Sequence, residues 1–408
     1  MDRHRENGAC AALVRPAVTV MLHRIFDILS SLKLTIICLS LAMVLVFVGT
    51  LAQVDSGIYD VQRRYFQSLI VWWQASPGGP GIPVFPGGHL LGAVLLLNLI
   101  AAHARRFRWA WSKLGIHLTH AGLIILLLGG LFTDLFSVES FMRLAPGETK
   151  NYSEDSRAVE LVVIDGSDSE LDQVTAIPEA RLRKEGLVEH ESLPFRINVK
   201  RFYQNSRFQP ISKAPPNSVP AATQGPGAMT VVYEVPPATA MNERDLQSAV
   251  IEILPPADGA KPLGSWLVSD QLGAPQSVSY AGKSWRFAMR PARYYKPFSL
   301  SLRKFNHDRY PGTEIPKNFA SHAVLIDPER GESRDVLIYM NNPLRYRGET
   351  FFQSGFEKND AATILQVVYN PSFVAPYLAC VIVGAGLLYQ FLFHFVGFLR
   401  QRKTIPAP

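Results

Sequence analysis

Four long apolar runs restrict what this 408-residue sequence can fold into. The hydrocarbon core of a bilayer is about 30 Å thick and is crossed by roughly 20 apolar residues in an α-helix. The runs lie at residues 34–53, 89–104, 114–136 and 373–398. The alternative, a buried helix in a soluble core, fits the second run best because it is the shortest and contains Asn98. We therefore predict a membrane protein with four transmembrane α-helices in a 3+1 arrangement, the fourth following residues 137–372.

Basic residues flank these runs on one side. Lys and Arg precede the first run, fill the link 105–113 between the second and third, and follow the fourth. Because cytoplasmic loops are enriched in Lys and Arg, residues 1–33, 105–113 and 399–408 are predicted to be cytoplasmic. Residues 54–88 and 137–372 are then extracytoplasmic. The first run is not expected to be a cleaved signal peptide, since its charged leader is long and no A-x-A-like site follows.

The overall charge reflects this topology. A net charge of +7 and a pI of about 9.2 would suit nucleic-acid binding. However, the three predicted cytoplasmic segments hold 12 Lys and Arg against three acidic residues, a net charge of +9, which leaves −2 for the rest. No basic patch with interleaved aromatic residues lies outside them, so we expect no nucleic-acid partner.

Motifs of several common enzyme classes are missing from the sequence. None of the three cysteines lies within 137–372, so this region offers neither a redox pair nor a structural disulfide. The sequence has no G-x-x-x-x-G-K-[ST], no H-E-x-x-H and no G-x-S-x-G. Thiol–disulfide exchange, P-loop ATP hydrolysis, zinc proteolysis and the common serine-hydrolase chemistry therefore lack support.

The region 137–372 has the pattern of β-structure. Alternating or β-branched runs are separated by turn residues, which is typical of a sandwich or barrel. The predicted strands lie at 158–165, 195–203, 230–235, 248–254, 298–305, 321–327, 335–340, 349–356 and 363–369, with a hairpin at 277–289. The Pro-rich insert 206–229 indicates a long loop or linker that divides the region into two lobes.

The extracytoplasmic loop 54–88 begins with apolar residues at helical spacing. They are Ile58, Val61, Tyr65, Leu69 and Trp72. This spacing predicts an amphipathic helix that lies on the membrane surface or packs against the outer domain. The Pro- and Gly-rich stretch 75–88 that follows excludes a helix there.

Histidines in the apolar runs are the main candidate site residues. Those in or at the edge of a run are His89, His103, His117, His120 and His394. An ionisable group within a membrane is costly and suggests a functional site, and imidazole is a usual axial ligand of haem iron. His120 lies about 9 Å along the third helix, with His117 one turn earlier. We interpret His120 as a metal or haem ligand, the alternative being an interhelical hydrogen bond; for His103, His117 and His394 packing or snorkelling is the simpler interpretation.

Three segments of the chain resemble the ResB-like cytochrome c biogenesis proteins. They are SLKLTIICLSLAMVLVFVGTLAQVDSGIYDVQRRYFQSLIVWW, LTHAGLIILLLGGLFTDLFSVESFMRLAPGET, and YPGTEIPKNFASHAVLID with VLIYMNNPLRYRGETFFQSGF. The most specific motif is N-P-L-R-Y-R-G-x-x-F-x-Q-S at 342–354. The resemblance covers most of residues 30–395, with the Pro-rich insert unmatched, and the order of three spans, outer domain and fourth span is also similar.

The resemblance implies a role in haem delivery for cytochrome c maturation in the bacterial cytoplasmic membrane, with the large domain on the periplasmic side. A tryptophan-rich, haem-handling multispanning membrane protein is the implied partner, and the C-x-x-C-H thiols of apocytochrome c are the implied acceptor. The membrane histidine of the family maps onto His120, with the second axial ligand from the partner. His117 departs from the pattern and leaves open which of the two ligates the haem. The chain is expected to be inactive as an enzyme alone.

Two further interpretations remain open. The chain could be a non-catalytic membrane scaffold whose β-domain docks a partner or apocytochrome without binding haem. A solute transporter fits poorly, because four spans without inverted repeats are atypical of such folds.

In the closing motif, Arg345 and Arg347 are predicted to alternate onto one strand face after a turn. They could clamp a haem propionate or a partner carboxylate, or more simply pair with acidic residues of the domain.

Overall fold

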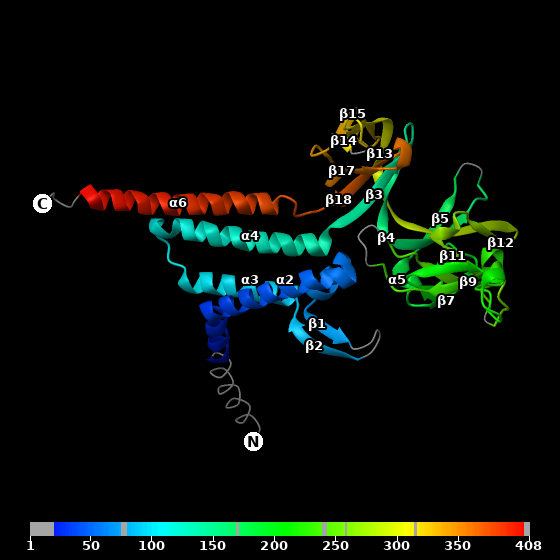
Figure 1. Ribbon diagram of the computed structural model, residues 1–408, viewed down its shortest axis with the longest axis horizontal. Coiled ribbons are helices and arrows are strands. Elements are labelled where there is room, and N and C mark those ends of the chain that lie inside the picture. Colours follow the sequence, from blue (N-terminus) through cyan, green and yellow to red (C-terminus); the bar gives the residue numbers. More distant parts are fainter. Residues whose placement is uncertain are drawn as a thin grey trace, which may run out of the picture. The chain divides into compact units, whose positions relative to one another are not determined.

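The computed structural model describes residues 20–74, 80–168, 171–238, 243–257, 259–313 and 316–403. The chain forms two compact units (Figure 1). The helical unit consists of Met1–Ser137 and Asn370–Pro408, and the β unit consists of Val138–Tyr369. Parts of the predicted cytoplasmic tails, 1–33 and 399–408, lie outside the described residues.

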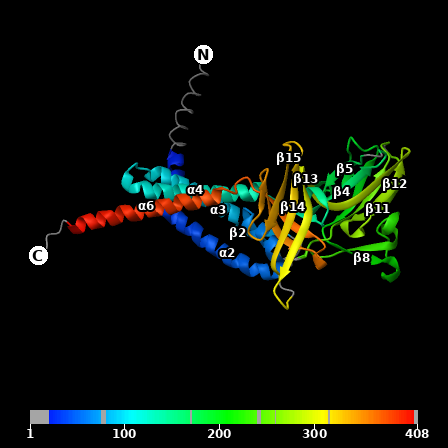
Figure 2. The same cartoon turned by 90° about the horizontal axis from the view of Figure 1, so that it is seen from above.

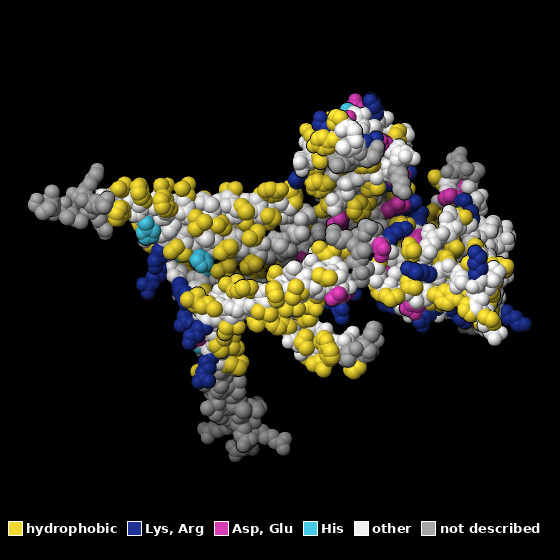
Figure 3. All heavy atoms as spheres, in the orientation of Figure 1, with side chains coloured by type: hydrophobic (Ala, Val, Ile, Leu, Met, Phe, Trp, Pro, Cys, Tyr) yellow, Lys and Arg dark blue, Asp and Glu magenta, His cyan; other side chains and the backbone are white. Residues whose placement is uncertain are grey.

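Among the described residues, four helices are long and apolar enough to cross a membrane. They are α2 (Leu32–Val61), α3 (Gly88–Arg106), α4 (Leu114–Phe136) and α6 (Ala375–Lys403). One turn of helix extends two of them, η1 (Gln62–Phe66) after α2 and η2 (Trp111–Lys113) before α4. Apolar side chains cover their outer surfaces (Figure 3), as expected for helices that contact lipid rather than water. The four predicted helices are confirmed.

The first helix is longer than predicted, and the amphipathic helix expected after it is wrong beyond Phe66. Helix α2 continues past the predicted end at Gln53 and bends at Gly57, whose φ of 72° is readily adopted only by glycine. The chain then forms strand β1 (Ile70–Gln74), which pairs antiparallel with β2 (Gly81–Pro86). The loop 54–88 therefore contains a β-hairpin.

The residue types of β1 explain this strand. Ile70, Val71, Trp72 and Trp73 are β-branched or aromatic and favour an extended, half-buried backbone. Val71 is buried in a small core with side chains of α2 and α3, whereas Trp72 and Trp73 are exposed. The apolar spacing that predicted a helix fits a strand equally well over so short a stretch.

A buried amide joins α2 to α3. Asn98 of α3 is 2% exposed and accepts a hydrogen bond from the hydroxyl of Thr35, with 2.6 Å between the oxygens. Its amide nitrogen donates to the carbonyl oxygens of Leu29 and Ser31. The polar residue that made the second run unusual is therefore fully engaged, as a polar group between apolar helices must be.

Glycines bring α4 and α6 into close contact. Gly115, Gly122 and Gly129 are buried and recur every seven residues along one face of α4. A Cβ atom at Gly115 would lie 2.5 Å from the carbonyl oxygen of Gly386, and one at Gly129 would lie 2.5 Å from the Cβ of Ala375. Such small residues let membrane helices approach closely enough for their backbones to pack.

The β unit contains the predicted strands and several others. The predicted ones are β4 (Thr149–Asp165), β7 (Arg196–Tyr203), β9 (Thr230–Glu234), β10 (Ser248–Leu254), β12 (Gln276–Tyr280), β13 (Lys283–Arg309), β14 (Pro316–Asp327), β15 (Glu332–Tyr339), β17 (Glu349–Phe356) and β18 (Thr363–Tyr369). The others are β3 (Val138–Leu144), β5 (Gln173–Pro178), β6 (Gly186–Val188), β8 (Ser206–Pro210), β11 (Gly264–Ser269) and β16 (Leu344–Tyr346), and helix α5 spans Glu179–Leu182. The predicted mainly-β domain is confirmed.

Two long strands organise these elements. The largest sheet has the order β15-β14-β13-β4-β3-β18-β17-β16, with β12 beside β13 and β5 beside β4. A four-stranded sheet has the order β11-β10-β7-β6, and β8 pairs with β9. Strands β4 and β13 are 17 and 27 residues long, and Figure 2 shows β13 and β14 along their length. The register of β13 on β4 shifts after Pro291 and again between Tyr295 and Leu300.

Two hydrophobic cores lie along β4 and β13. The first contains Leu161 and Phe287 and packs one end of these strands against β7, β10 and β11. The second contains Leu300 and Phe351 and packs the other end of β13 against β3, β14, β15, β17 and β18. We call the parts around them the first and second lobes. The two strands continue from one lobe into the other, so the division lies along them.

The Pro-rich insert 206–229 is therefore not the linker between lobes that the sequence predicted. It begins with β8, which is paired with β9, and it covers the face of the four-stranded sheet that the first core leaves open. Ala222 of the insert is buried with Val250 and Leu267 of that sheet. The proline and serine content correctly indicated an irregular backbone. This backbone packs against the four-stranded sheet because Ala222 and Gly227 are small.

The β unit is expected to lose stability in acid partly through Asp165. This carboxylate accepts hydrogen bonds from Nζ of Lys283, at 2.7 Å, and from the backbone N–H of Ser167, and these lower its pKa to about 2. A lowered folded-state pKa contributes stability that is complete above the unfolded pKa of about 3.9 and is lost as the pH falls towards 2.

Asp165→Asn should therefore flatten the pH dependence in this window. The measurement is the unfolding temperature of the β unit between pH 5 and pH 2, followed by near-ultraviolet circular dichroism. Asp335→Asn, at a side chain that is 72% exposed, is the control. Equal pH profiles for the wild type and Asp165→Asn would contradict the assignment.

Candidate functional site

The three histidines that the sequence singled out lie together at one end of the helical unit. His103 lies in the last turn of α3, and His117 and His120 lie in the first two turns of α4. The ring centroid of His103 is 5.1 Å from that of His117 and 5.5 Å from that of His120. We call these residues the histidine cluster. The link 107–113 folds α4 back beside α3, which brings residues from two helices together.

Aromatic and basic side chains surround the histidine cluster. The ring of Phe107 lies 4.8 Å from that of His117, and the ring of Trp109 stacks parallel to His117 at 6.4 Å. The histidines are half-buried, whereas Phe107 and Trp109 are exposed. Figure 3 shows histidine side chains beside a group of Lys and Arg at this end of the helices. The cluster therefore combines imidazoles, flat apolar surface and positive charge.

Backbone carbonyls fix the tautomers of two rings. Nδ1 of His120 donates to the carbonyl oxygen of Ile116 at 2.7 Å, which leaves the Nε2 lone pair available. Nε2 of His117 donates to the carbonyl oxygen of Arg108 at 3.2 Å. Within the described residues, Nδ1 of His117 is buried and has no hydrogen-bond partner. An imidazole whose N–H is bound to a carbonyl presents its other nitrogen as a ligand.

These residues fit haem better than a bare metal ion. Among the described residues, no group of three or more His, Cys, Asp or Glu side chains could hold a metal ion. Haem needs only one or two protein ligands, because the porphyrin supplies the other donors. An available nitrogen on His120, the buried unpaired Nδ1 of His117, and adjacent aromatic rings meet that requirement.

The remaining membrane histidines have other partners. The Nε2 atom of His394 in α6 lies 2.7 Å from the side-chain nitrogen of Gln390, one turn away on the same helix. His89, in the first turn of α3, contacts the carboxylate of Asp134 in the last turns of α4. The sequence identified His89 but not Asp134, whose signal is that it is the single acidic residue in an apolar helix.

The two arginines of the closing motif do not share a strand face as predicted. Strand β16 ends at Tyr346, and Arg347 and Gly348 form a two-residue turn with φ values of 45° and 83°. The turn directs the guanidinium of Arg347 to the buried carboxylate of Asp327, with Nε and Nη2 at 2.7 and 2.9 Å from its oxygens. Arg345 stands on β16 with an exposed side chain.

Asp327 is the centre of this second site and was missed from the sequence. It also accepts a hydrogen bond from the hydroxyl of Tyr346 at 2.7 Å. Burial alone would raise the pKa of Asp327, but hydrogen bonds from Tyr346, the backbone N–H of Arg330 and Arg347 lower it. Hydrogen bonds to Glu329 and then Asp327 raise the pKa of Arg347. The arrangement is the intradomain pairing of a buried charge.

Comparison with known proteins agrees with the resemblance seen in the sequence. The ResB-like family matches the chain over residues 276–372, which run from β12 to the segment after β18 and include the closing motif. A stretch of 105 residues is 37% identical to Protein NrfI of Wolinella succinogenes. This stretch is 26% of the present chain and 12% of that protein, so the chain matches about an eighth of the relative's length. The resemblance to ResB-like proteins is confirmed.

Proposed function

Starting from the ResB-like match over residues 276–372, we propose that the chain is a membrane component of cytochrome c biogenesis. Its task is to hold haem at the histidine cluster and to pass it towards the C-x-x-C-H thiols of apocytochrome c. A tryptophan-rich multispanning membrane protein acts with it. The observation that carries the haem part of the proposal is the meeting of His103, His117 and His120 at one end of α3 and α4.

The proposed topology places this cluster where haem enters. Helices α2, α3, α4 and α6 cross the membrane, and the basic link 105–113 lies on the cytoplasmic side. The histidine cluster is then at the cytoplasmic end of α3 and α4. The chain leaves α4 at its other end for β3, which supports an extracytoplasmic β unit. Haem supplied from inside would reach the cluster first.

His120 is the proposed ligand in this chain. Its Nδ1–H is held by the carbonyl of Ile116, so the ring orientation is set before haem arrives and Nε2 is available to the iron. The partner protein would supply a further ligand. The ring of His103 lies beside that of His120, and the basic residues of 105–113 offer charge to the propionates.

The test is haem content after replacement of His120. The chain is co-purified with its multispanning partner, and haem is measured by its absorption spectrum and by extraction. We expect His120→Gly to lose most of the haem and added imidazole to restore part of it, because imidazole can occupy the vacated ligand position. His394→Gly, outside the histidine cluster, is the matched control and should keep its haem.

Two outcomes would contradict this assignment. Unchanged haem in His120→Gly, with loss in His117→Gly or His103→Gly, would move the ligand within the cluster. Absence of haem from the wild-type complex would instead favour the scaffold, in which the β unit docks a partner and the histidines only pack. In such a scaffold Arg347 would not clamp a carboxylate of the partner, because its guanidinium is bound to Asp327.

A further inference from the structure

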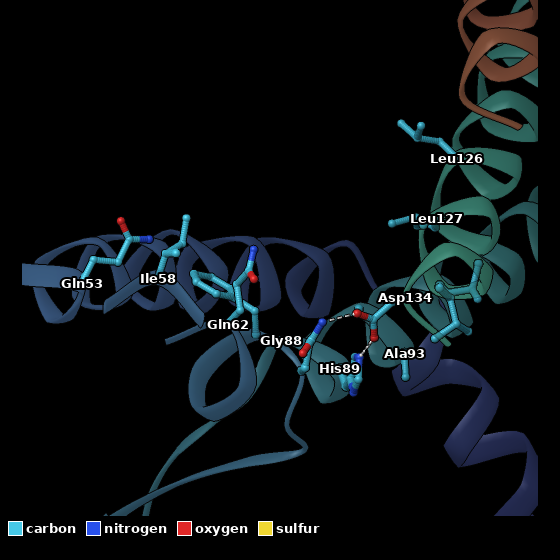
Figure 4. A pocket seen from close by; sticks show the side chains of 15 residues that line it. Gln53, Ile58, Gln62, Gly88, His89, Ala93, Leu126, Leu127 and Asp134 are labelled. Atoms are coloured by element: carbon cyan, nitrogen blue, oxygen red, sulfur yellow. Dashed lines mark hydrogen bonds and ion pairs between the residues drawn. The ribbon is translucent and has the colours of Figure 1, made fainter. Parts of the chain in front are cut away.

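A pocket of about 560 Å³ lies at the opposite end of α3 from the histidine cluster. Residues from the end of α2, the start of α3 and the end of α4 line this half-open pocket (Figure 4). His89 in this pocket is 14 positions before His103 on α3, a separation of about 21 Å along the helix axis. The pocket is therefore a separate site within the helical unit.

Polar groups meet at one side of this pocket. The carboxylate of Asp134 is 2.6 Å from Nε2 of His89 (Figure 4). It also accepts a hydrogen bond from Nε2 of Gln67 at 2.5 Å. The side chains of His89 and Asp134 are 31% and 24% exposed. An ionisable residue in an apolar helix is costly and marks a candidate functional site. Here, partners on two other elements hold the carboxylate.

Apart from Gln53 and Gln62, the rest of the pocket lining is apolar or glycine. Its side chains include Phe66, Leu96, Leu127 and Leu131. Gly92 of α3 and Gly130 of α4 also line the pocket, and a Cβ atom at either position would meet no atom within 4 Å. The open space beside both glycines can admit a flat or slender apolar molecule.

Charge restricts what this molecule can be. No Lys or Arg is among the described residues that line the pocket, whereas Asp134 is. A fatty acid, a phospholipid phosphate or a haem propionate would therefore meet a carboxylate without a compensating cation. A neutral head with hydroxyl or carbonyl oxygens suits the site, because Asp134 has remaining lone pairs and Gln67 has a second amide hydrogen.

We propose that this pocket binds a lipid-soluble quinone or quinol. The hydroxyl groups of the quinol donate to Asp134, the carbonyl oxygens of the quinone accept from the second amide hydrogen of Gln67, and the hydrocarbon tail lies along the leucine wall between α3 and α4. Binding is reversible and involves no covalent step. The proposal does not depend on haem at the histidine cluster, since the two sites use different residues at opposite ends of α3.

The test uses the full chain in detergent and decylubiquinone as the probe, with affinity measured by calorimetry. Gly130→Leu and Gly92→Leu should each lower the affinity by about tenfold or more, because the added side chain occupies the open space. Gly384→Leu is the matched control: Gly384 lies in α6, also has no atom within 4 Å of its Cβ position, and does not line the pocket. It should bind like the wild type.

Displacement by other ligands and the unfolding temperatures of the variants complete the test. Palmitate and haemin should fail to displace decylubiquinone from the wild type, whereas Asp134→Asn should lower the affinity for decylubiquinol, whose hydroxyl loses its carboxylate acceptor, and should admit palmitate. Displacement of the probe by palmitate or haemin from the wild type, or wild-type affinity in both Gly130→Leu and Gly92→Leu, would overturn the proposal. Quinone affinity should be unchanged in His120→Gly, so failure at the haem site and failure here are distinguishable. Unfolding temperatures of the leucine variants confirm that they are folded.

Discussion

Gly129→Leu is expected to break the packing of α4 against α6, whereas Gly130→Leu, at the next residue, is expected to keep it. A Cβ at Gly129 would lie 2.5 Å from the Cβ of Ala375, an atom fixed to the backbone of α6. A Cβ at Gly130 would meet nothing within 4 Å. Overpacking of a close contact costs roughly 1–3 kcal/mol, and helices in lipid have no hydrophobic force to hold them together against it.

The same face of α4 is closely packed along its length, so the effect should recur. A Cβ at Gly122 would lie 2.6 Å from a methyl group of Val383 and 3.0 Å from the carbonyl oxygen of Ala379. Gly122→Leu is therefore expected to act like Gly129→Leu. Since α4 also carries His117 and His120, the proposed function predicts that loss of this packing lowers haem content although the proposed ligand is unchanged.

A cross-link measures this packing directly. The hydroxyl oxygens of Thr133 in α4 and Ser372 before α6 are 3.2 Å apart. Cysteines at these two positions, in a chain whose native cysteines are replaced, should form a disulfide on mild oxidation. The yield should stay high with Gly130→Leu and fall sharply with Gly129→Leu. Equal yields in the two leucine variants would contradict the role given to the glycine face.

Helix positions and strands could be predicted because each depends on a local pattern. An apolar run of the right length can satisfy its backbone in lipid only as a helix, so the four helices follow from length and composition. Alternation and β-branching located the predicted strands of the β unit in the same way. The pattern failed at 58–72, where helical spacing and a short strand give similar sequences, and β-branched and aromatic residues with a partner at Gly81–Pro86 favoured the strand.

The sites could be predicted only in part because their partners are distant in sequence. The histidine cluster was within reach of the sequence, since the short link 107–113 forces α3 and α4 to be neighbours. In contrast, Asp134 reaches His89 across 45 positions, and Asp327 precedes Arg347 by 20. Nothing in a single sequence identifies such pairs before the helices or strands are arranged, and the turn that directs Arg347 depends on the positive φ at Gly348.

Asp327→Ala is expected to destabilise the second lobe more than any loss of an exposed ion pair in the β unit. Asp327 is fully buried at the end of β14. Its removal takes two hydrogen bonds from the guanidinium of Arg347, which keeps Glu329, and leaves the hydroxyl of Tyr346 with Glu332 alone. Partly buried donors that lose an acceptor retain much of their desolvation cost, which is why removing one partner costs more than the pair contributes.

The unfolding temperature of the β unit, measured by near-ultraviolet circular dichroism, separates this effect from a surface effect. Arg303→Ala is the matched control, because Arg303 and Asp335 are 63% and 72% exposed and such a pair contributes about 0–1 kcal/mol. Asp327→Asn, which keeps the shape but not the charge, should lie between them. If Arg347 is structural, as its contacts indicate, the proposed function predicts that cytochrome c maturation falls in Asp327 variants only as far as the amount of folded protein falls. A variant with a normal unfolding temperature and lost maturation would instead give the Asp327–Arg347 pair a role in binding.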